Sequence, residues 1–255
     1  MKYVVQVALL FAFVPGWVGC VDTGQERVGI SLSVSGVQQD APVVGRNGWQ
    51  TELDQAWLVF GPLYLCAGVQ AGELCETAQA EWTSATIVNT LDPIPVPAGE
   101  MNAISGFVRS WMYDLGFVSL LTQSEPLVTD AAQVLGNNSL RLVGKAVLDQ
   151  TTIPFVAELV FQQEEATEQG IPVVRSGSDA VTFEHAIHMG DHLLVQVDPA
   201  SWLLDVDFDA IAEAKNCTGS TCPVVRFEPG SQAARAIETQ VVAGKPPEFI
   251  WQSSK

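Results

Sequence analysis

Apolar and polar residues alternate along much of the chain after its first 27 residues. In VGISLSVSGV, Ile30, Leu32 and Val34 fall on one face and serines on the other, which is the two-residue period of a half-buried strand. TELDQAWLVFGPLYLC begins with alternation and continues as an apolar run typical of a central strand, in which Gly61-Pro62 marks a break or bulge. Further strands are predicted in LRLVGKAVL, PFVAELVFQQ, DAVTFEHAIHM and HLLVQVDP.

Short turn signals such as GNNS, TEQGIP and GD separate these strands, and no long helix lies between them. The sequence therefore predicts a mainly β fold, an antiparallel β-sandwich or barrel-like domain. Short helices, mostly C-terminal, are predicted in TDAAQVLG, DFDAIAEAK and SQAARAIETQVV. Asp207 is placed to cap the second, and the third starts at Ser231. The aromatic residues Phe107, Trp111, Tyr113 and Phe117 are predicted to belong to the core.

The N-terminal segment has the features of a secretory signal. Lys2 precedes an apolar run of about eleven residues, whereas a membrane-spanning helix needs roughly 20. The segment ends in Trp17-Val18-Gly19-Cys20, which resembles the lipobox of bacterial lipoproteins, although Trp17 stands where leucine is usual. The resemblance implies cleavage after residues 1–19 and acylation of Cys20 with fatty acids such as palmitate, a stable membrane anchor. The alternative is an ordinary signal peptide cut near Gly19.

This division of the N-terminus gives the predicted organisation of the whole chain. Residues 1–19 form the signal peptide, 20–27 a lipidated tether and 28–255 a single β-rich domain. A chain anchored in this way belongs to the bacterial cell envelope, at the outer membrane or the cell surface.

The chain has five cysteines, and assigning Cys20 to lipid leaves four. These four form two local pairs in CAGVQAGELC and CTGSTC, so we predict the disulfides Cys66–Cys75 and Cys217–Cys222 among the three connectivities. An oxidising compartment outside the cytoplasm would preserve them. The alternative, a zinc site of four thiolates, is disfavoured because neither pair has the two-residue spacing of a zinc knuckle.

The balance of charge excludes one class of partner. The net charge is −17, and it becomes more negative when the signal peptide, which contains Lys2 and no acidic residue, is removed. Such a surface repels phosphate backbones, so nucleic acid is not expected as a partner. A protein or glycan partner, and a membrane reached through the lipid anchor, remain.

No enzyme motif is present in the sequence. It lacks G-x-S-x-G, G-x-x-x-x-G-K and H-E-x-x-H, so we predict that the protein is not an enzyme, although a triad assembled from distant segments stays open. The acidic run DVDFD fails as an EF-hand calcium loop, because Ala210 and Asn216 occupy the positions that need glycine and glutamate.

All three histidines lie in HAIHMGDH. A helix would align His185, His188 and His192 on one face as metal ligands, but the strand-like residues on both sides favour a two-residue hairpin centred on Gly190-Asp191. In that hairpin His188 points to the face opposite His192, and His185 lies roughly 13 Å along the strand from the Met189 position. The three histidines therefore do not chelate one ion, and the hairpin is predicted to be chiefly structural.

A metal site with fewer ligands is the alternative for this segment. The hairpin places Met189 opposite His192, and an imidazole with a thioether suits copper, with zinc as a second metal. Asp191, Met101 or Met112 would complete such a site. Without it, no cofactor is predicted.

Two stretches, GWQTELDQAWLVFGPLYLC and GDHLLVQVDPASWLLDVDF, are similar to segments of uncharacterised bacterial lipoproteins of Gram-negative surfaces. The resemblance implies a secreted, anchored, mostly β protein and transfers no catalytic residue. The sequence thus predicts an envelope or cell-surface lipoprotein that acts as a binding or structural module through loops of its β-sandwich. The alternative is a periplasmic copper-type metal-binding protein that uses the His-Met hairpin.

Overall fold

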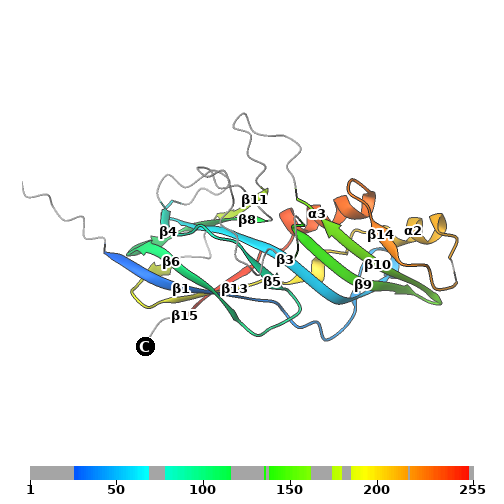
Figure 1. Cartoon of the computed structure of the whole chain (residues 1–255), viewed down its shortest axis with the longest axis horizontal. Helices are drawn as coiled ribbons and strands as arrows, with labels where there is room; N and C mark the ends of the chain where they lie inside the picture. The colour runs from blue at the N-terminus through cyan, green and yellow to red at the C-terminus, as the bar shows by residue number, and fades with distance from the viewer. Residues whose placement is uncertain are drawn as a thin grey trace, which may run out of the picture.

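The computed structural model describes residues 26–68, 78–115, 135, 138–161, 174–179, 185–217 and 219–252, with 174–179 described by their backbone alone. One long strand, β3 (Gln50–Cys66), runs through much of the molecule (Figure 1). Along one edge it pairs antiparallel first with β9 (Leu140–Leu148) and then with β8 (Ser110–Leu115). Along the other edge it pairs with β2 (Val43–Val44), β5 (Thr86–Asn89) and β4 (Ala78–Trp82). The predicted break at Gly61-Pro62 is confirmed, since the pairing with β8 shifts register between Phe60 and Leu63.

The main path of the sheet has the order β14-β10-β9-β3-β4-β6-β1-β13-β15. Most neighbours are antiparallel, and the pairs β1–β13 and β10–β14 are parallel. The prediction of a mainly β, sandwich-like fold dominated by antiparallel pairing is therefore confirmed. The remaining bounds are β1 (Arg27–Ser35), β6 (Val96–Ile104), β7 (Gly106–Val108), β10 (Thr151–Leu159), β11 (Val174–Asp179), β12 (His185–Ile187), β13 (His192–Gln196), β14 (Val225–Phe227), β15 (Glu248–Gln252), α2 (Phe208–Ala214) and α3 (Gln232–Ala243).

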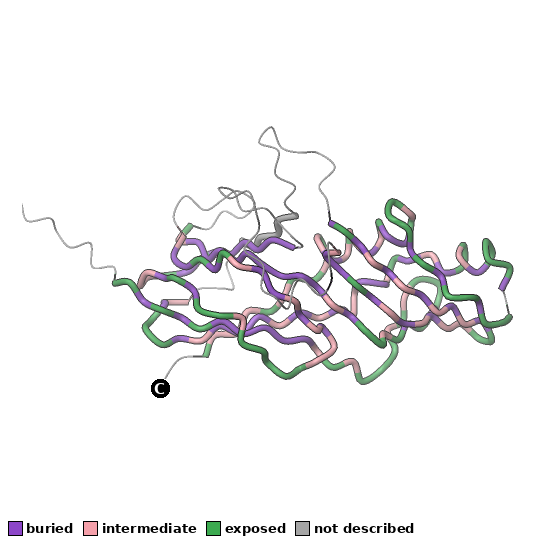
Figure 2. Tube along the Cα trace, viewed as in Figure 1, coloured by how far each residue is buried: buried purple, intermediate pink, exposed green. Residues whose placement is uncertain are grey.

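The core follows the alternation of the sequence. Buried and exposed positions alternate along the strands in Figure 2, and Ile30, Leu32 and Val34 of β1 are all buried, as predicted. Ser33 and Ser35, which were predicted on the polar face, are buried as well, so the half-buried pattern holds only for the first part of the strand. Trp111 packs on Phe249 of β15, with 4.4 Å between ring centroids. The strand β8 therefore lies across the core from β15, which gives the sheet its two layers.

The molecule has two differently built ends (Figure 1). We call the part made of β9, β10, β14 and α2 the disulfide end. We call the part made of β4, β6, β7, β12 and the start of β1 the groove end. The strand β3 connects the two.

Aromatic side chains and helix caps define the disulfide end. Phe155 packs on Phe208 and Phe227, with centroids 5.8 and 5.2 Å apart, and Trp49 packs on Phe208 at 5.6 Å. The predicted N-cap of α2 is confirmed, since the Asp207 side chain accepts a hydrogen bond from the backbone N–H of Ala210. The predicted disulfide Cys217–Cys222 follows this helix.

Other predictions about helices and core have mixed outcomes. Helix α3 is capped by Ser231, as predicted. Trp111 and Tyr113 are buried, but Phe107 is 58 % exposed, so its assignment to the core is wrong. It lies on the short strand β7, which pairs only with the equally short β12 among the described residues and leaves one face uncovered. The predicted helix at 129–136 falls largely outside the described residues, as does Phe117. Over the ranges described, no helix has the length and apolar character to cross a membrane.

Candidate functional site

The predicted hairpin at Gly190-Asp191 is wrong, because its two flanking strands do not pair with each other. The strand β12 pairs with β7, whereas β13 pairs with β1 on one side and β15 on the other. The backbone explains the difference: Gly190 N–H donates to the carbonyl of Gly29, and Ser31 N–H donates to the carbonyl of Asp191. Hydrogen bonds to β1 thus take the place of the hairpin ladder, and the turn connects two separate sheets.

Asp191 holds this turn together from inside. Its side chain is buried, and Oδ2 accepts hydrogen bonds from the backbone N–H of His188 and from Nε2 of His185, both at 2.9 Å. The His185 ring stacks on Trp251, with 4.0 Å between centroids and 9° between planes. The carboxylate and the indole therefore fix the imidazole from two directions, which is a positioning role within the fold.

The other candidate ligands point elsewhere. His192 Nδ1 is 2.7 Å from the hydroxyl oxygen of Ser31, and the side chains of His188 and Met189 are exposed. Because β12 and β13 do not pair with each other, the predicted placement of Met189 opposite His192 loses its geometric basis. Met101 and Met112, proposed as supporting ligands, are buried in the core. Within the described ranges, no group of three or more His, Cys, Asp or Glu side chains is arranged to hold a metal ion.

Two further predictions concern cysteines: the disulfide Cys66–Cys75 and the lipidation of Cys20. Cys66 is disulfide-bonded, but its predicted partner Cys75 lies outside the described residues, so that connectivity stays a prediction. Cys20, the predicted lipidation site, also lies outside them.

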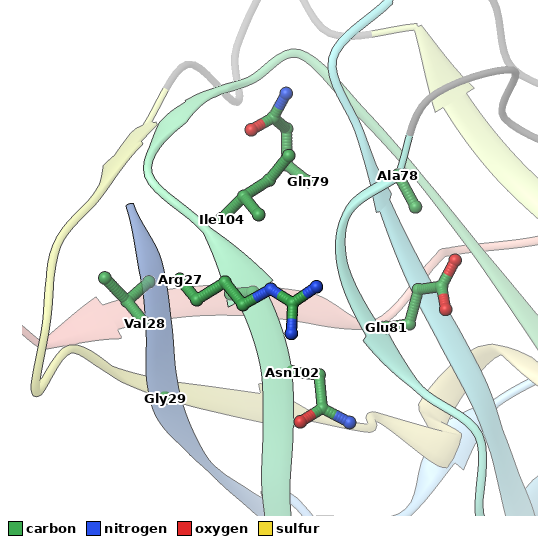
Figure 3. A pocket seen from close by; sticks show the side chains of 9 residues that line it. Arg27, Val28, Gly29, Ala78, Gln79, Glu81, Asn102 and Ile104 are labelled. Carbon is green, nitrogen blue, oxygen red and sulfur yellow. The ribbon is translucent and has the colours of Figure 1, made fainter. Parts of the chain in front are cut away.

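A groove that the sequence did not predict opens over β1, β4 and β6 at the groove end (Figure 3). It encloses about 550 Å³. Strand register explains its floor: Asn102 of β6 lies between Glu81 of β4 and Gly29 of β1. Gly29 has no side chain, and the space that its Cβ would occupy is empty, since no atom lies within 4 Å of that position. A glycine in the row where larger side chains would stand leaves the hollow open.

Opposite charges line this groove. The side chains of Arg27 on β1 and Glu81 on β4 are exposed, and both residues line the hollow. The Arg27 guanidinium extends over the intervening strand β6 (Figure 3). Among the ion pairs and side-chain hydrogen bonds of the described residues, neither side chain has a partner. The guanidinium of Arg27 can therefore donate hydrogen bonds to a ligand in the groove, and the carboxylate of Glu81 can accept them.

A buried amide also belongs to the groove. Gln79 of β4 lines it and is only 4 % exposed, and its Oε1 has no hydrogen-bond partner in the described structure. A Cβ on Gly106 would come within 2.7 Å of this oxygen, so the glycine lets β7 lie close over the amide. Buried acceptors are nearly always satisfied in proteins, so this oxygen beside the hollow is able to accept a hydrogen bond from water or from a ligand.

Sequence reasoning missed this groove because its residues come from three strands that are distant in the chain. Two local signals were present: Gly29 stands on the face where the alternation of VGISLSVSGV otherwise places serines, and Arg27 is one of only 12 basic residues in an acidic chain. Neither signal shows which strands lie beside β1.

No family model matches the chain, and no curated protein matches it. One solved structure that resembles it over most of its length is "MbnP from Methylosinus trichosporium". The TM-score is 0.40 and the sequence identity 9%, over 89% of this chain and 98% of that one. A likeness this weak indicates neither ligand nor chemistry.

Proposed function

We propose that this protein is a lipid-anchored envelope protein that acts as a binding module, with Cys20 as its anchor and the groove over β1, β4 and β6 as its ligand site. The lipobox-like sequence before Cys20 supports the anchor. The shape and charge of the groove support the ligand site. The sequence predicted binding through loops of the sandwich, whereas this proposal assigns it to a sheet surface at the groove end.

The observation that carries the ligand site is the pair of opposite charges that line one hollow without an ion pair between them. Five basic side chains of the described residues form ion pairs with carboxylates. Arg226 contacts Glu158 and Lys145 contacts Glu52, for example. Arg235 on α3 also forms no ion pair among the described residues, but it does not line the groove. Arg27 combines the absence of an ion pair in the described structure with a position in the hollow, and this combination suits it to contact a ligand.

The anchor and the groove lie close together in the chain. Arg27 follows Cys20 by seven residues, which span at most roughly 24 Å when fully extended. Glu26, just before β1, is bonded to Ser105 at the corner between β6 and β7 through its N–H and its carbonyl. The proposed anchor would therefore hold the groove end near the membrane surface.

The anchor is tested by expressing the full-length gene, partitioning the product with detergent and weighing its N-terminal peptide. Recovery in the detergent phase with a diacylated Cys20 supports the proposal. An unmodified Cys20 in the soluble phase contradicts it.

The ligand site is tested by filling the groove. Because a Cβ at Gly29 meets nothing, Gly29→Val should fold normally while its side chain occupies the floor of the hollow. A panel of amino acids, phosphate esters and monosaccharides is screened by ligand-observed NMR against the wild type and this variant. Binding that disappears in Gly29→Val supports the site, and a panel that binds both forms equally, or neither, contradicts it.

The copper-type alternative keeps one supporting observation. Met189 is 63 % exposed next to the exposed His188, and thioether and imidazole together suit Cu(I). Titration of the tag-free protein with Cu(I), Cu(II) and Zn(II) tests this, with His188→Ala as the paired variant. One-to-one submicromolar binding that is lost in the variant supports the alternative, and weak binding unaffected by it contradicts the alternative.

A further inference from the structure

We infer that the groove binds a small zwitterion, with an anionic carboxylate or phosphate on Arg27 and a primary ammonium on Glu81. The inference rests on the proposed function of the groove as a ligand site, and it specifies the chemistry of the ligand.

The register of the sheet determines the distance between Arg27 and Glu81 that a ligand must bridge. Arg27 pairs with Ile104 on β6, two residues along from the row that contains Asn102 and Glu81. Neighbouring strands lie roughly 4.8 Å apart, so β1 and β4 are separated by about 10 Å across β6. The two charged groups do not come within the 4.0 Å of an ion pair. A molecule with both charges on a short linker is suited to this gap.

Each side chain is matched to one half of such a molecule. A guanidinium presents its N–H groups as a planar fork that meets a carboxylate or a phosphate with two parallel hydrogen bonds. The Glu81 carboxylate accepts hydrogen bonds only, so it suits an ammonium with N–H donors. Asn102, between them, offers an amide oxygen and an amide nitrogen to either half.

Ligands with a single charge fit this groove less well. An anion alone would place its charge near Glu81 in a protein whose net charge is −17, and a cation alone would face Arg27. A neutral sugar would cover both charged groups without neutralising either, and burying an unpaired charge is costly. A zwitterion satisfies both.

Two neutral features of the groove agree with this ligand. The floor at Gly29 is open, so a small ligand can lie against the backbone of β1. The buried Oε1 of Gln79, which has no partner within the part of the chain described, is an acceptor for a further ligand N–H. Both features favour a compact molecule with several N–H donors over a long or apolar one.

This chemistry has two sources. It occurs in free molecules such as phosphoethanolamine and amino acids, and it occurs in the headgroup of phosphatidylethanolamine. The proposed anchor at Cys20 would bring a headgroup within reach. The experiment therefore includes both soluble and membrane-bound forms.

The test is isothermal titration of the full-length product, purified in detergent, with phosphoethanolamine and serine as zwitterions. Ethanolamine and glycerol phosphate supply each charge alone, and phosphocholine replaces the ammonium with a group that has no N–H donor. We expect at least one zwitterion to bind, and ethanolamine, glycerol phosphate and phosphocholine to bind at least tenfold more weakly than it, since a hydrogen bond to a charged group contributes about that factor or more.

The variants assign the two halves of the ligand. Arg27→Ala and Glu81→Gln should each weaken zwitterion binding at least tenfold. Arg235→Ala and Glu213→Gln remove one charge of each sign from exposed positions on α3 and α2, and they should leave binding unchanged. Tighter binding of glycerol phosphate to Glu81→Gln than of the zwitterion to the wild type would identify an anion site and overturn the inference.

Other results separate this inference from the proposed function. If the zwitterions do not bind but a member of the wider panel binds in a manner that Gly29→Val abolishes, the zwitterion is wrong and the ligand site stands. If Gly29→Val changes nothing for any compound, both fail. Flotation with phosphatidylethanolamine or phosphatidylcholine vesicles then identifies the source. Preference for phosphatidylethanolamine that depends on Arg27 and Glu81 supports a headgroup, and binding of soluble zwitterions without it supports a free ligand.

Discussion

The strand β3 runs through both the disulfide end and the groove end, but among the described residues charged side chains are paired at the first, and two that line the groove are left unpaired at the second. At the disulfide end Glu158 contacts both Arg141 and Arg226, Lys145 contacts Glu52, and an aromatic cluster lies beneath. At the groove end a guanidinium and a carboxylate line one hollow without pairing, and a glycine leaves the floor open.

The difference indicates how the protein divides its tasks. Side chains that satisfy one another stabilise the fold but have little left to offer a ligand. Exposed charged side chains that are left without partners add little to stability and are available for binding. We therefore assign stability mainly to the disulfide end and recognition to the groove end, and substitutions at the two ends should separate these properties.

The largest effect on stability is expected from Phe155→Ala. This side chain is buried between Phe208 and Phe227, so its removal leaves a cavity and lowers the free energy of unfolding by about 3 to 5 kcal/mol. Urea denaturation measures the change. The exposed Phe107 is the matched control, and its replacement by alanine should cost less than about 0.5 kcal/mol. Equal losses in both variants would contradict the assignment of the core.

Removing the Cys217–Cys222 disulfide should have the next largest effect. The bond closes a loop with a sequence separation of 5, and the chain-entropy relation gives a stabilisation of about 2 kcal/mol for a loop this short. The double replacement by alanine is compared with the wild type by urea denaturation. Ligand binding in the groove should be unchanged, and a loss of binding together with stability would show that the two ends are not independent.

At the turn between the two sheets, Asp191→Ala should lower the free energy of unfolding by about 1 to 2 kcal/mol. The substitution leaves the backbone N–H of His188 and Nε2 of His185 without their acceptor. Asp191→Asn keeps a side-chain oxygen and should lose less. If both variants were as stable as the wild type, Asp191 would not be what holds the turn.

Arg27→Ala should change the stability by no more than about 0.5 kcal/mol, because the guanidinium makes no ion pair in the described structure. Thermal unfolding without ligand measures this. A clear loss of stability would show that Arg27 stabilises the fold. It would contradict the assignment of stability to the disulfide end and recognition to the groove end.

The smallest effect concerns the pH dependence of one surface ion pair. The hydrogen bond from Lys145 to Glu52, together with the charge of that carboxylate, raises the pKa of Lys145 above its ordinary value of 10.5. A raised folded-state pKa contributes stability below the unfolded-state value, and the contribution is lost as the pH rises through the folded-state value. NMR titration should show the raised pKa in the wild type and a return toward 10.5 in Glu52→Gln, and an identical pKa in both would contradict it.

The parts of the fold that were predicted correctly depend on local signals. The alternation in the first part of β1 and the capping serine of α3 are each encoded within about a dozen neighbouring residues. The hairpin at Gly190-Asp191 failed because long-range pairing replaced a local turn. The parallel alignment of Ser31 with His192 joins positions far apart in the sequence, and nothing in HAIHMGDH indicates it.

The groove escaped prediction for the same reason. Arg27, Glu81 and Asn102 have no common spacing or motif, and they meet only because β6 lies between β1 and β4. Conversely, the three histidines lie within eight residues of the sequence, but the fold gives His185 and His192 different partners. Proximity in the chain was thus a poor guide to the site.

The separation of stability from recognition is tested most directly by mapping where a ligand binds. The ¹⁵N-labelled protein is titrated with phosphoethanolamine, and the shifts of its backbone amides are followed. We predict changes at Gly29, Glu81 and Asn102, and none around Cys217 and Cys222. Changes concentrated at the disulfide end, or no change at the groove end with any zwitterion of the panel, would contradict the account.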